Sequence, residues 1–311
     1  MCCLFGIVDY GGNLTARQKS RLITALSIAA EERGTDATGI AYNTAHGLHI
    51  FKRPVAAHRL HLHIPANAKI VMGHTRMTTQ GVAKRNCNNH PFSGVAGKEH
   101  FAFAHNGMLL NDLWLRSKYR LPRTKIETDS YAAVQMIEQK QKLDWDSLRD
   151  TAEAVEGSFT FTVLSEKDRL YFIKGDSPMK IFHYHTLGVY LYASTENILR
   201  SALRGCGNWL GSGVELPISI GEMLSIDDSG IIERTNFDAG NLFSYGRYYG
   251  APLYRPAFSP NSSYVQELKD IASAFGYAPE DIDELLSCGF SPEEIEDYFY
   301  ESGEDAYAHI G

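Results

Sequence analysis

Short apolar runs, each ended by glycine or polar residues, dominate the first part of the chain. The run CLFGIVDY at 3–10 ends at Gly11-Gly12, which predicts a buried strand. Over residues 15–33 the apolar positions recur at helical spacing. Thr15 can cap this helix and Gly34 can end it, so the pattern predicts a strand followed by an amphipathic helix.

The remaining pattern is richer in strands than in helices. Residues 37–43 and 47–53 flank a turn and predict a hairpin. Helices are predicted over 128–142, capped by Thr128, over 144–156, capped by Asp144, and near 196–204. The other predicted strands are 69–77, 100–107, 158–165, 169–176, 188–195 and 221–228. This order lacks regular alternation of strand and helix, so we expect an α+β fold with largely antiparallel sheets.

Composition narrows the class of protein. The 311 residues are 44% hydrophobic and 22% charged, as in folded proteins of aqueous compartments. No run approaches the roughly 18 apolar residues of a membrane span, and no secretory leader is visible, so we expect a cytoplasmic protein that does not bind membranes. The five cysteines are scattered and odd in number, which fits a reducing compartment. A net charge of −7 argues against nucleic acid as the main ligand.

The charge is distributed unevenly and suggests a domain boundary. Residues 264–311 hold thirteen acidic residues and one lysine, so their net charge is −12 and the rest of the chain sums to +5. We expect a catalytic domain at 2–240, a linker or wrapping segment at 241–263, and an acidic helical tail at 264–311. The tail reads as three short helices, the last over 291–302, with a weak likeness to a ubiquitin-associated bundle. It either docks on its own domain or recruits a partner.

Polar residues gather at the ends of the predicted strands. GHTRMTTQG offers His74, Arg76 and Thr79, NNHPF offers His90, and AHNG offers His105, Asn106 and Gly107. ETDS places Asp129 at a helix start. Taken singly, these features are typical of a surface arginine, a turn, a helix cap and structural imidazoles.

Cys2 gives the set a chemical meaning. A cysteine made N-terminal by removal of Met1 carries a free α-amine with a pKa of about 7.7–8.0, which can accept the thiol proton. The thiolate can then attack a carbonyl. An asparagine amide beside a glycine N–H can stabilise the oxyanion. Arg76 and Asp129 suit the carboxylate and ammonium of an amino acid.

The ordered motifs resemble the class II glutamine amidotransferases, which are N-terminal nucleophile hydrolases. MCCLFGIV resembles their M-C-G-I-F-G start, and ERGTDATGIA resembles R-G-x-D-S-x-G-I-A. GHTRMTTQG resembles G-H-T-R-W-A-T-x-G, NNHPF resembles N-x-H-P, AHNGMLLN resembles H-N-G-x-x-x-N, and ETDS resembles E-T-D-T/S. Weaker likenesses continue at GSFTFTVL and KGDSPMKI, so the resemblance covers about residues 2–235.

The resemblance implies a four-layer αββα sandwich of two antiparallel sheets, and release of ammonia from glutamine through a γ-glutamyl thioester. Its nucleophile would be Cys2, with Asn106 and Gly107 as the oxyanion hole. Arg76 would bind the substrate carboxylate and Asp129 its ammonium. The remaining expected site residues are Thr79 as a substrate contact, Arg33 as a support for the N-terminus, and His74, His90 and His105 as further supports. No cofactor or metal is expected.

Three residues depart from the family pattern. Cys3 stands where glycine is usual, so a second thiol lies beside Cys2. Met77 replaces a common tryptophan that helps form a lid, and Gln80 replaces a common histidine. These departures leave open whether the pocket closes tightly on glutamine.

Three functions remain open at this stage. The first is a glutaminase domain whose ammonia goes to an acceptor site on another chain, since some 70 residues after the domain are too few for a synthase. The second is a stand-alone amidohydrolase of γ-glutamyl or related amides. The third is a catalytically silent binding or regulatory protein on the same fold, which the retained Cys2, Arg76 and Asp129 argue against.

A metal site is a weaker alternative. Cys87 with His90, and the group His58, His61 and His63, could supply ligands. Neither matches a closed zinc spacing. On a strand His61 and His63 would share a face that excludes His58, so we interpret this group as polar strand positions.

Overall fold

The computed structural model describes residues 2–204, 208–242, 263–274, 278–287 and 295. The chain divides into two compact units, Met1–Ser244 and Tyr245–Gly311. The first unit contains every residue that the sequence assigns to chemistry.

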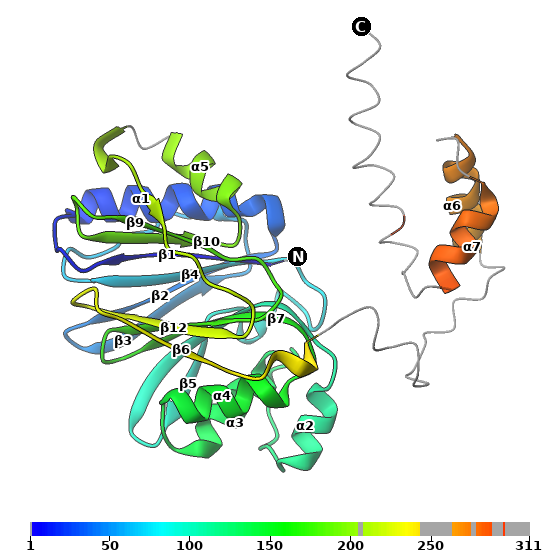
Figure 1. Ribbon diagram of the computed structural model, residues 1–311, viewed down its shortest axis with the longest axis horizontal. Coiled ribbons are helices and arrows are strands. Elements are labelled where there is room, and N and C mark those ends of the chain that lie inside the picture. Colours follow the sequence, from blue (N-terminus) through cyan, green and yellow to red (C-terminus); the bar gives the residue numbers. More distant parts are fainter. Residues whose placement is uncertain (1, 205–207, 243–262, 275–277, 288–294, 296–311) are drawn as a thin grey trace, which may run out of the picture. The chain divides into compact units, whose positions relative to one another are not determined.

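Two antiparallel sheets form the centre of the first unit (Figure 1). The seven-stranded sheet has the order β11 (Val214–Glu215), β9 (Lys180–Tyr184), β10 (Val189–Ala193), β1 (Cys3–Asp9), β4 (Ile70–Arg76), β2 (Ala37–Thr44) and β3 (Gly47–Arg53). The six-stranded sheet has the order β13 (Ile232–Asn236), β12 (Glu222–Asp227), β8 (Arg169–Lys174), β7 (Gly157–Ser165), β6 (Glu99–Leu109) and β5 (Phe92–Ala96). Alternating side chains of both sheets fill the space between them, among them Leu4, Met72, Ala104 and Phe172.

Helices cover the outer face of each sheet. The first outer layer is α1 (Ala16–Ala29) with α5 (Glu196–Arg204), packed on the seven-stranded sheet. The second is α2 (Asp112–Lys118), α3 (Tyr131–Lys140) and α4 (Trp145–Ala154), packed on the six-stranded sheet. Three apolar clusters separate the four layers, which confirms the predicted α+β sandwich of two antiparallel sheets.

The first strand and helix form as the sequence predicts. All seven residues of β1 are buried, because it is an inner strand between β10 and β4. Thr15 caps α1 through a reciprocal hydrogen-bonded box with Gln18. After α1 a short 3-10 helix, η1 (Ala30–Arg33), ends at Gly34. The predicted hairpin is β2–β3 and the Asp144 cap of α4 is present, so these predictions are confirmed.

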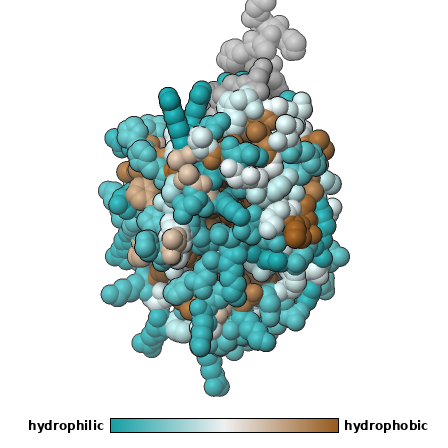
Figure 2. All heavy atoms as spheres, turned by 90° about the vertical axis from the view of Figure 1, so that its left-hand side faces the viewer, coloured by the Kyte–Doolittle hydropathy of each residue, from teal (hydrophilic) through white to brown (hydrophobic). Residues whose placement is uncertain are grey.

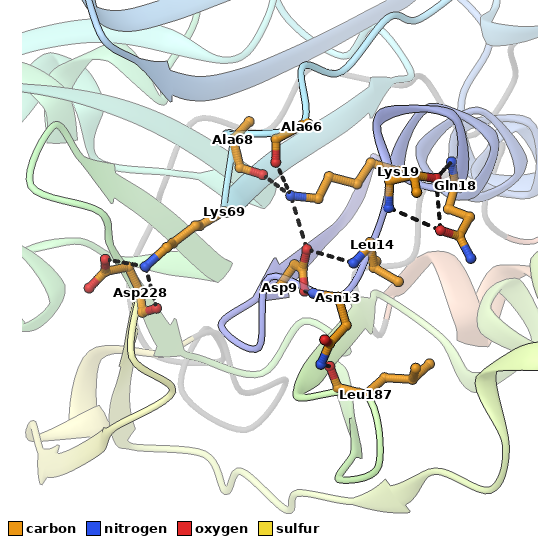
Figure 3. A network of polar contacts seen from close by, with 11 residues as sticks. Asp9, Asn13, Leu14, Gln18, Lys19, Ala66, Ala68, Lys69, Leu187 and Asp228 are labelled. Atoms are coloured by element: carbon orange, nitrogen blue, oxygen red, sulfur yellow. Dashed lines mark hydrogen bonds and ion pairs between the residues drawn. The ribbon is translucent and has the colours of Figure 1, made fainter.

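A buried ion pair fixes the connection between β1 and α1 (Figure 3). Lys19 Nζ lies 2.9 Å from Asp9 Oδ2, and both side chains are almost wholly buried. The ammonium also donates to the carbonyls of Ala66 and Ala68, each at 2.7 Å. Asp9 accepts in turn from the backbone N–H groups of the following turn, so each buried charge has several partners.

Two local predictions are wrong. Ser130, and not Thr128, is the N-cap residue of α3, and the Thr128 hydroxyl is buried without a hydrogen-bond partner. The residue between them, Asp129, does not cap the helix either, because its carboxylate accepts from Leu109 N on β6. The stretch from His58 to His63 is not a strand, because it begins in the 3-10 helix η2 (Ala57–Arg59) and continues as an extended segment without ladder partners.

The Asn106-Gly107 pair does not form a turn. Both residues lie inside β6, which continues to Leu109 and pairs with β7 along its whole end. Gly107 has φ of +133°, and a Cβ there would come within 2.0 Å of the Ser158 carbonyl oxygen. Only glycine fits this position.

The second unit has a small apolar core of its own. Its described helices are α6 (Ser263–Ala274) and α7 (Pro279–Ser287), and Pro279 is the first residue of α7. Leu268, Ala272, Ile282 and Ile295 form the buried centre. The third predicted helix, over 291–302, lies outside the described residues apart from Ile295. The predicted domain limits stay a prediction.

The surface of the first unit is mainly polar. Figure 2 shows one face on which hydrophilic side chains predominate and hydrophobic ones are scattered. Among the described helices, none has the length and apolar character needed to cross a bilayer.

Candidate active site

The two sheets bring the predicted site residues to one end of the first unit. β1 and β4 pair with Cys3 opposite Thr75, so the same register places Cys2 opposite Arg76. A narrow pocket opens there. It is lined by Cys2, Arg76, Met77, Thr79, Gln80, His90, His105, Gly107, Thr128, Asp129 and Ser130.

The structure separates the roles of the two adjacent thiols. Cys2 lines the pocket, and its Sγ lies 3.5 Å from the Met77 carbonyl oxygen. Cys3 is fully buried in the cluster beneath α1, and burial raises the pKa of its thiol to about 11. Successive residues of a strand point to opposite faces, so only one of the two thiols can face the pocket.

The environment of Cys2 favours the neutral thiol. Burial raises its pKa, while the Met77 carbonyl contact, the N-terminal charge and Arg76 act in the opposite direction. Formation of the thiolate therefore requires a base close to the sulfur. Arg33 Nε donates to the Cys2 carbonyl oxygen at 3.0 Å, which holds this residue at the start of β1.

Arg76 is a buried cation without an acidic partner. Its side chain donates to Asn89 Oδ1 at 2.7 Å and to the Gln80 carbonyl oxygen at 2.5 Å, and only 3% of the residue is exposed. It forms no ion pair within the part of the chain that the structure describes. Burial lowers its pKa, and Cys2, Asp36 and Asp129 partly offset this. A carboxylate that enters the pocket would meet an uncompensated guanidinium.

Asp129 faces the same pocket from the segment just before α3, which packs on the six-stranded sheet. Its Oδ2 accepts from Leu109 N at 2.6 Å, and its own N–H donates to Gln80 Oε1 at 2.7 Å. Ser130 Oγ lies 3.3 Å from Asp129 Oδ1 and 2.8 Å from His105 Nδ1. These contacts hold a carboxylate in place beside the pocket.

Three imidazoles form a buried layer at the pocket, and two of them, His90 and His105, line it. His74 and His90 lie with ring centroids 4.3 Å apart, and His74 Nε2 donates to the His105 carbonyl oxygen at 3.0 Å. Burial lowers the pKa of all three, that of His74 to about 3. The rings are therefore neutral near pH 7, and both ring nitrogens of His90 lack a hydrogen-bond partner.

The structure brings most, but not all, of the predicted residues to the pocket wall. Cys2, Arg76, Thr79, His90, His105, Gly107 and Asp129 line it. Arg33, His74 and Asn106 lie behind it. Asn106 is buried, and its Nδ2 donates to Ser194 Oγ at 3.4 Å. That hydroxyl also accepts from Leu4 N, so it links Asn106 to the strand that carries the thiol.

Sequence reasoning assigned no site role to four pocket residues and one connecting residue. The pocket residues are Met77, Gln80, Thr128 and Ser130, and Ser194 connects Asn106 to β1. Ser130 directly follows Asp129 and could have been found by proximity, whereas Gln80 was noted only as a departure from the family pattern. Nothing in the local sequence around Ser194 indicates its contact.

Neither metal alternative gains support from the geometry. His58 Nδ1 contacts Glu31 at 3.0 Å instead of turning toward another histidine. Across the described residues no three His, Cys, Asp or Glu side chains gather as a metal site. A broader surface hollow, whose lining includes Lys98, Lys142 and Glu166, contains no cysteine or histidine, so we place the chemistry at the Cys2 pocket.

Comparisons with known proteins agree with the motif order. Residues 21–172 match the family model described as "Glutamine amidotransferases class-II". The chain is 25% identical over 207 residues to 7-cyano-7-deazaguanine synthase of Sulfolobus acidocaldarius, covering 63% of this chain and 44% of that protein. It is 31% identical over 185 residues to glutamine--fructose-6-phosphate aminotransferase [isomerizing] of Halalkalibacterium halodurans, covering 57% and 30%. The chain thus spans less than half the length of these relatives.

The fold also has a solved counterpart. The glutamine phosphoribosylpyrophosphate amidotransferase of B. subtilis superposes with a TM-score of 0.59 at 18% identity, over 76% of this chain and 49% of that one. At this identity the likeness concerns the fold, and it agrees with the two-sheet sandwich described above.

Proposed function

Because the chain carries a class II glutamine amidotransferase domain, we propose that it hydrolyses the side-chain amide of glutamine through a thioester on Cys2. The products are glutamate and ammonia, and the ammonia passes to an acceptor site on another chain. The observation that carries this proposal is the pocket in which a thiol, an anchored aspartate and a buried arginine that forms no ion pair with a described residue converge.

The head of the substrate is recognised by charge. Arg76 receives the α-carboxylate, which gives the buried guanidinium the anionic partner it lacks. Asp129 receives the α-ammonium. Thr79 lies on the pocket wall and contacts the substrate. Because both charged groups sit on one carbon of the substrate, this recognition fixes the direction of its side chain toward Cys2.

The thiol attacks the side-chain carbonyl. After removal of Met1, the α-amine of Cys2 takes the proton from Sγ, and the thiolate forms a C–S bond to the amide carbon. Asn106 Nδ2 and Gly107 N–H donate to the oxyanion of the tetrahedral intermediate. The C–N bond breaks as the α-ammonium returns the proton to the leaving nitrogen, which departs as ammonia. Water then cleaves the thioester and releases glutamate.

Purified chain should release glutamate and ammonia from L-glutamine in equal amounts. A glutamine-like diazoketone should add one mass increment, and peptide mapping should place it on Cys2. Cys2→Ala should remove both turnover and adduct. Cys3→Ala should keep the adduct on residue 2, because that thiol packs in the core. An adduct on Cys3 with Cys2 free would refute the assignment.

The same turnover assay distinguishes the proposed glutaminase from the alternative, a stand-alone amidohydrolase. Met77 is 50% exposed at the pocket edge, where a larger aromatic ring would cover more of the opening. Substitution of other γ-glutamyl amides for glutamine tests whether the open edge admits larger leaving groups. Faster cleavage of such an amide than of glutamine would favour an amidohydrolase that works without an acceptor.

A further inference from the structure

We propose that Gln80 is a positioning residue that holds the two head-group residues, Arg76 and Asp129, in one fixed frame. It thereby makes the pocket selective for amides that carry both a free α-carboxylate and a free α-ammonium. This inference rests on the proposed function and assigns to Gln80 a task distinct from the chemistry at Cys2.

The two head-group residues belong to different layers of the sandwich. Arg76 ends β4 of the seven-stranded sheet, whereas Asp129 precedes α3, which packs on the six-stranded sheet. Within the described residues no hydrogen bond or ion pair joins them directly. Their separation therefore depends on whatever connects the two layers at the pocket.

Gln80 makes that connection with two different groups. Its main-chain carbonyl oxygen accepts from Arg76 Nη2 at 2.5 Å. Its side-chain Oε1 accepts from Asp129 N at 2.7 Å, across 49 positions of the sequence. One residue thus contacts the cationic and the anionic partner at the same time.

The orientation of the Gln80 amide follows from hydrogen-bond chemistry. The Asp129 main-chain nitrogen is a donor, so the amide oxygen must face it and the Nε2 donors must point the other way. Gln80 lines the pocket, and the described residues include no acceptor for Nε2. The side chain therefore bridges the layers and still leaves a neutral donor at the pocket wall.

Neutrality is essential to this arrangement. A carboxylate at position 80 would add a negative charge to the pocket that Arg76 also lines, and it would compete with the substrate carboxylate. An apolar side chain of similar length would leave the Asp129 N–H without its acceptor. A glutamine fills the position without either cost.

The test measures binding of product-like ligands as well as turnover. L-glutamate carries both head groups, glutarate lacks the ammonium, and 4-aminobutanoate lacks the α-carboxylate. In Gln80→Met, the dissociation constant of L-glutamate from calorimetry should rise about 10- to 100-fold, because misplaced partners no longer meet both charges together. KM for L-glutamine should rise by a similar factor, and kcat should change by less than about threefold.

Ligands that lack one head group distinguish a positioning role of Gln80 from a general disturbance of the pocket. The Gln80→Met substitution should weaken the binding of glutarate and of 4-aminobutanoate far less than the binding of L-glutamate. Neither of these two ligands can contact both Arg76 and Asp129 through its head group. Gln139→Met, an exposed glutamine on α3, is the matched control and should bind all three ligands as the unaltered chain does. Equal weakening of all three ligands in Gln80→Met, or unchanged L-glutamate binding, would overturn the inference.

Binding also distinguishes the two proposals. If the unaltered chain binds L-glutamate but hydrolyses no glutamine, the proposed chemistry is refuted. A selective loss of L-glutamate binding in Gln80→Met would still support the positioning role of Gln80. If the unaltered chain hydrolyses glutamine and Gln80→Met has a normal KM for glutamine, only the positioning role of Gln80 is refuted. A chain that neither binds L-glutamate nor hydrolyses glutamine would refute both.

Discussion

At the scale of single residues, the site depends on which way each side chain points. Cys2 and Cys3 are neighbours, yet one lines the pocket and the other packs beneath α1. Asn106 and Gly107 are likewise adjacent on β6, and Gly107 lines the pocket while Asn106 contacts Ser194 behind it. The two members of each pair therefore have different surroundings, although they are adjacent in the sequence.

Asn106 allows a direct test of the oxyanion assignment. Asn106→Ala removes one donor and should lower kcat about 10²- to 10³-fold while KM for glutamine changes little, because the substrate head is bound elsewhere. Steady-state kinetics on purified variants measure both constants. Asn241→Ala, an exposed asparagine whose amide contacts Glu153, is the control and should keep normal kcat. Unchanged kcat in Asn106→Ala, with chemistry rate-limiting, would contradict the assignment.

At the scale of elements, buried polar contacts fix how strands and helices meet. The Asp9–Lys19 pair sits where β1 passes into α1, and Figure 3 shows Lys19 reaching both that carboxylate and two backbone carbonyls. The His74, His90 and His105 layer joins β4, the segment before β5, and β6. Both groups lie inside the molecule, so the energies of their charged forms differ strongly from those in water.

Breaking the Asp9–Lys19 pair should be costly. Asp9→Asn leaves the buried ammonium without its counter-charge and should lower the free energy of unfolding by about 3–5 kcal/mol. Urea denaturation followed by circular dichroism measures this. The Lys69–Asp228 pair in the same view is the control, because its side chains are 41% and 39% exposed. Asp228→Asn should cost less than about 1 kcal/mol, and an equal loss in both variants would contradict the argument.

The imidazole layer should make stability depend on pH. Burial lowers the pKa of His74, His90 and His105 in the folded chain, whereas an unfolded histidine titrates near 6.5. Below about pH 6.5 the unfolded chain binds protons that the folded chain does not, so stability is lost as the pH falls from there toward the lowered pKa values.

Removing one of these imidazoles should weaken that dependence. His90 is the best choice, because neither of its ring nitrogens has a partner that the substitution would orphan. His90→Leu should reduce the slope of unfolding free energy against pH by about 1.4 kcal/mol per pH unit below pH 6. Urea titrations at pH 7, 6 and 5 give the slope. An unaltered slope would mean that His90 titrates alike in both states.

At the scale of the whole molecule, each unit has its own core. Among the residues that the structure describes, the three apolar clusters of the sandwich contain none after Leu242, and the cluster around Leu268 and Ile282 contains none before Leu268. The acidic tail, with its net charge of −12, is therefore not needed to complete the described core of the catalytic unit. We predict that it acts in recruitment or docking and takes no part in the chemistry.

Truncation tests that prediction. A chain ending at Ser244 should stay folded and keep basal glutamine hydrolysis, and a melting temperature within a few degrees of that of the full chain would favour recruitment of a partner over docking on the catalytic unit. A large fall in melting temperature would mean that the tail covers apolar surface of the catalytic unit. Loss of glutaminase activity in a stable truncated protein would contradict the division of roles and place the tail at the active site.

The amino-acid sequence by itself determined the elements and the kinds of reactive group. Apolar periodicity located β1, α1 and the β2–β3 hairpin. Burial of one face of an element produces a repeating pattern of apolar residues within a short segment of sequence. Ordered motifs indicated the resemblance to the class II glutamine amidotransferases and nominated Cys2, Arg76 and Asp129. Local signals failed at Thr128, because Ser130 is the N-cap residue of α3, and at Asn106-Gly107, where strand pairing overrode a turn signal.

Only the tertiary structure decided how these groups meet. The bridge from Gln80 to Asp129, the link from Ser194 to Asn106, and the neutral state of His74 all depend on residues distant in sequence. Hydrogen bonds across layers and loss of water arise when two sheets close on each other, and neither leaves a periodic trace in the chain. The sequence therefore specifies which groups are present, and the packing of the sheets sets their distances, charges and partners.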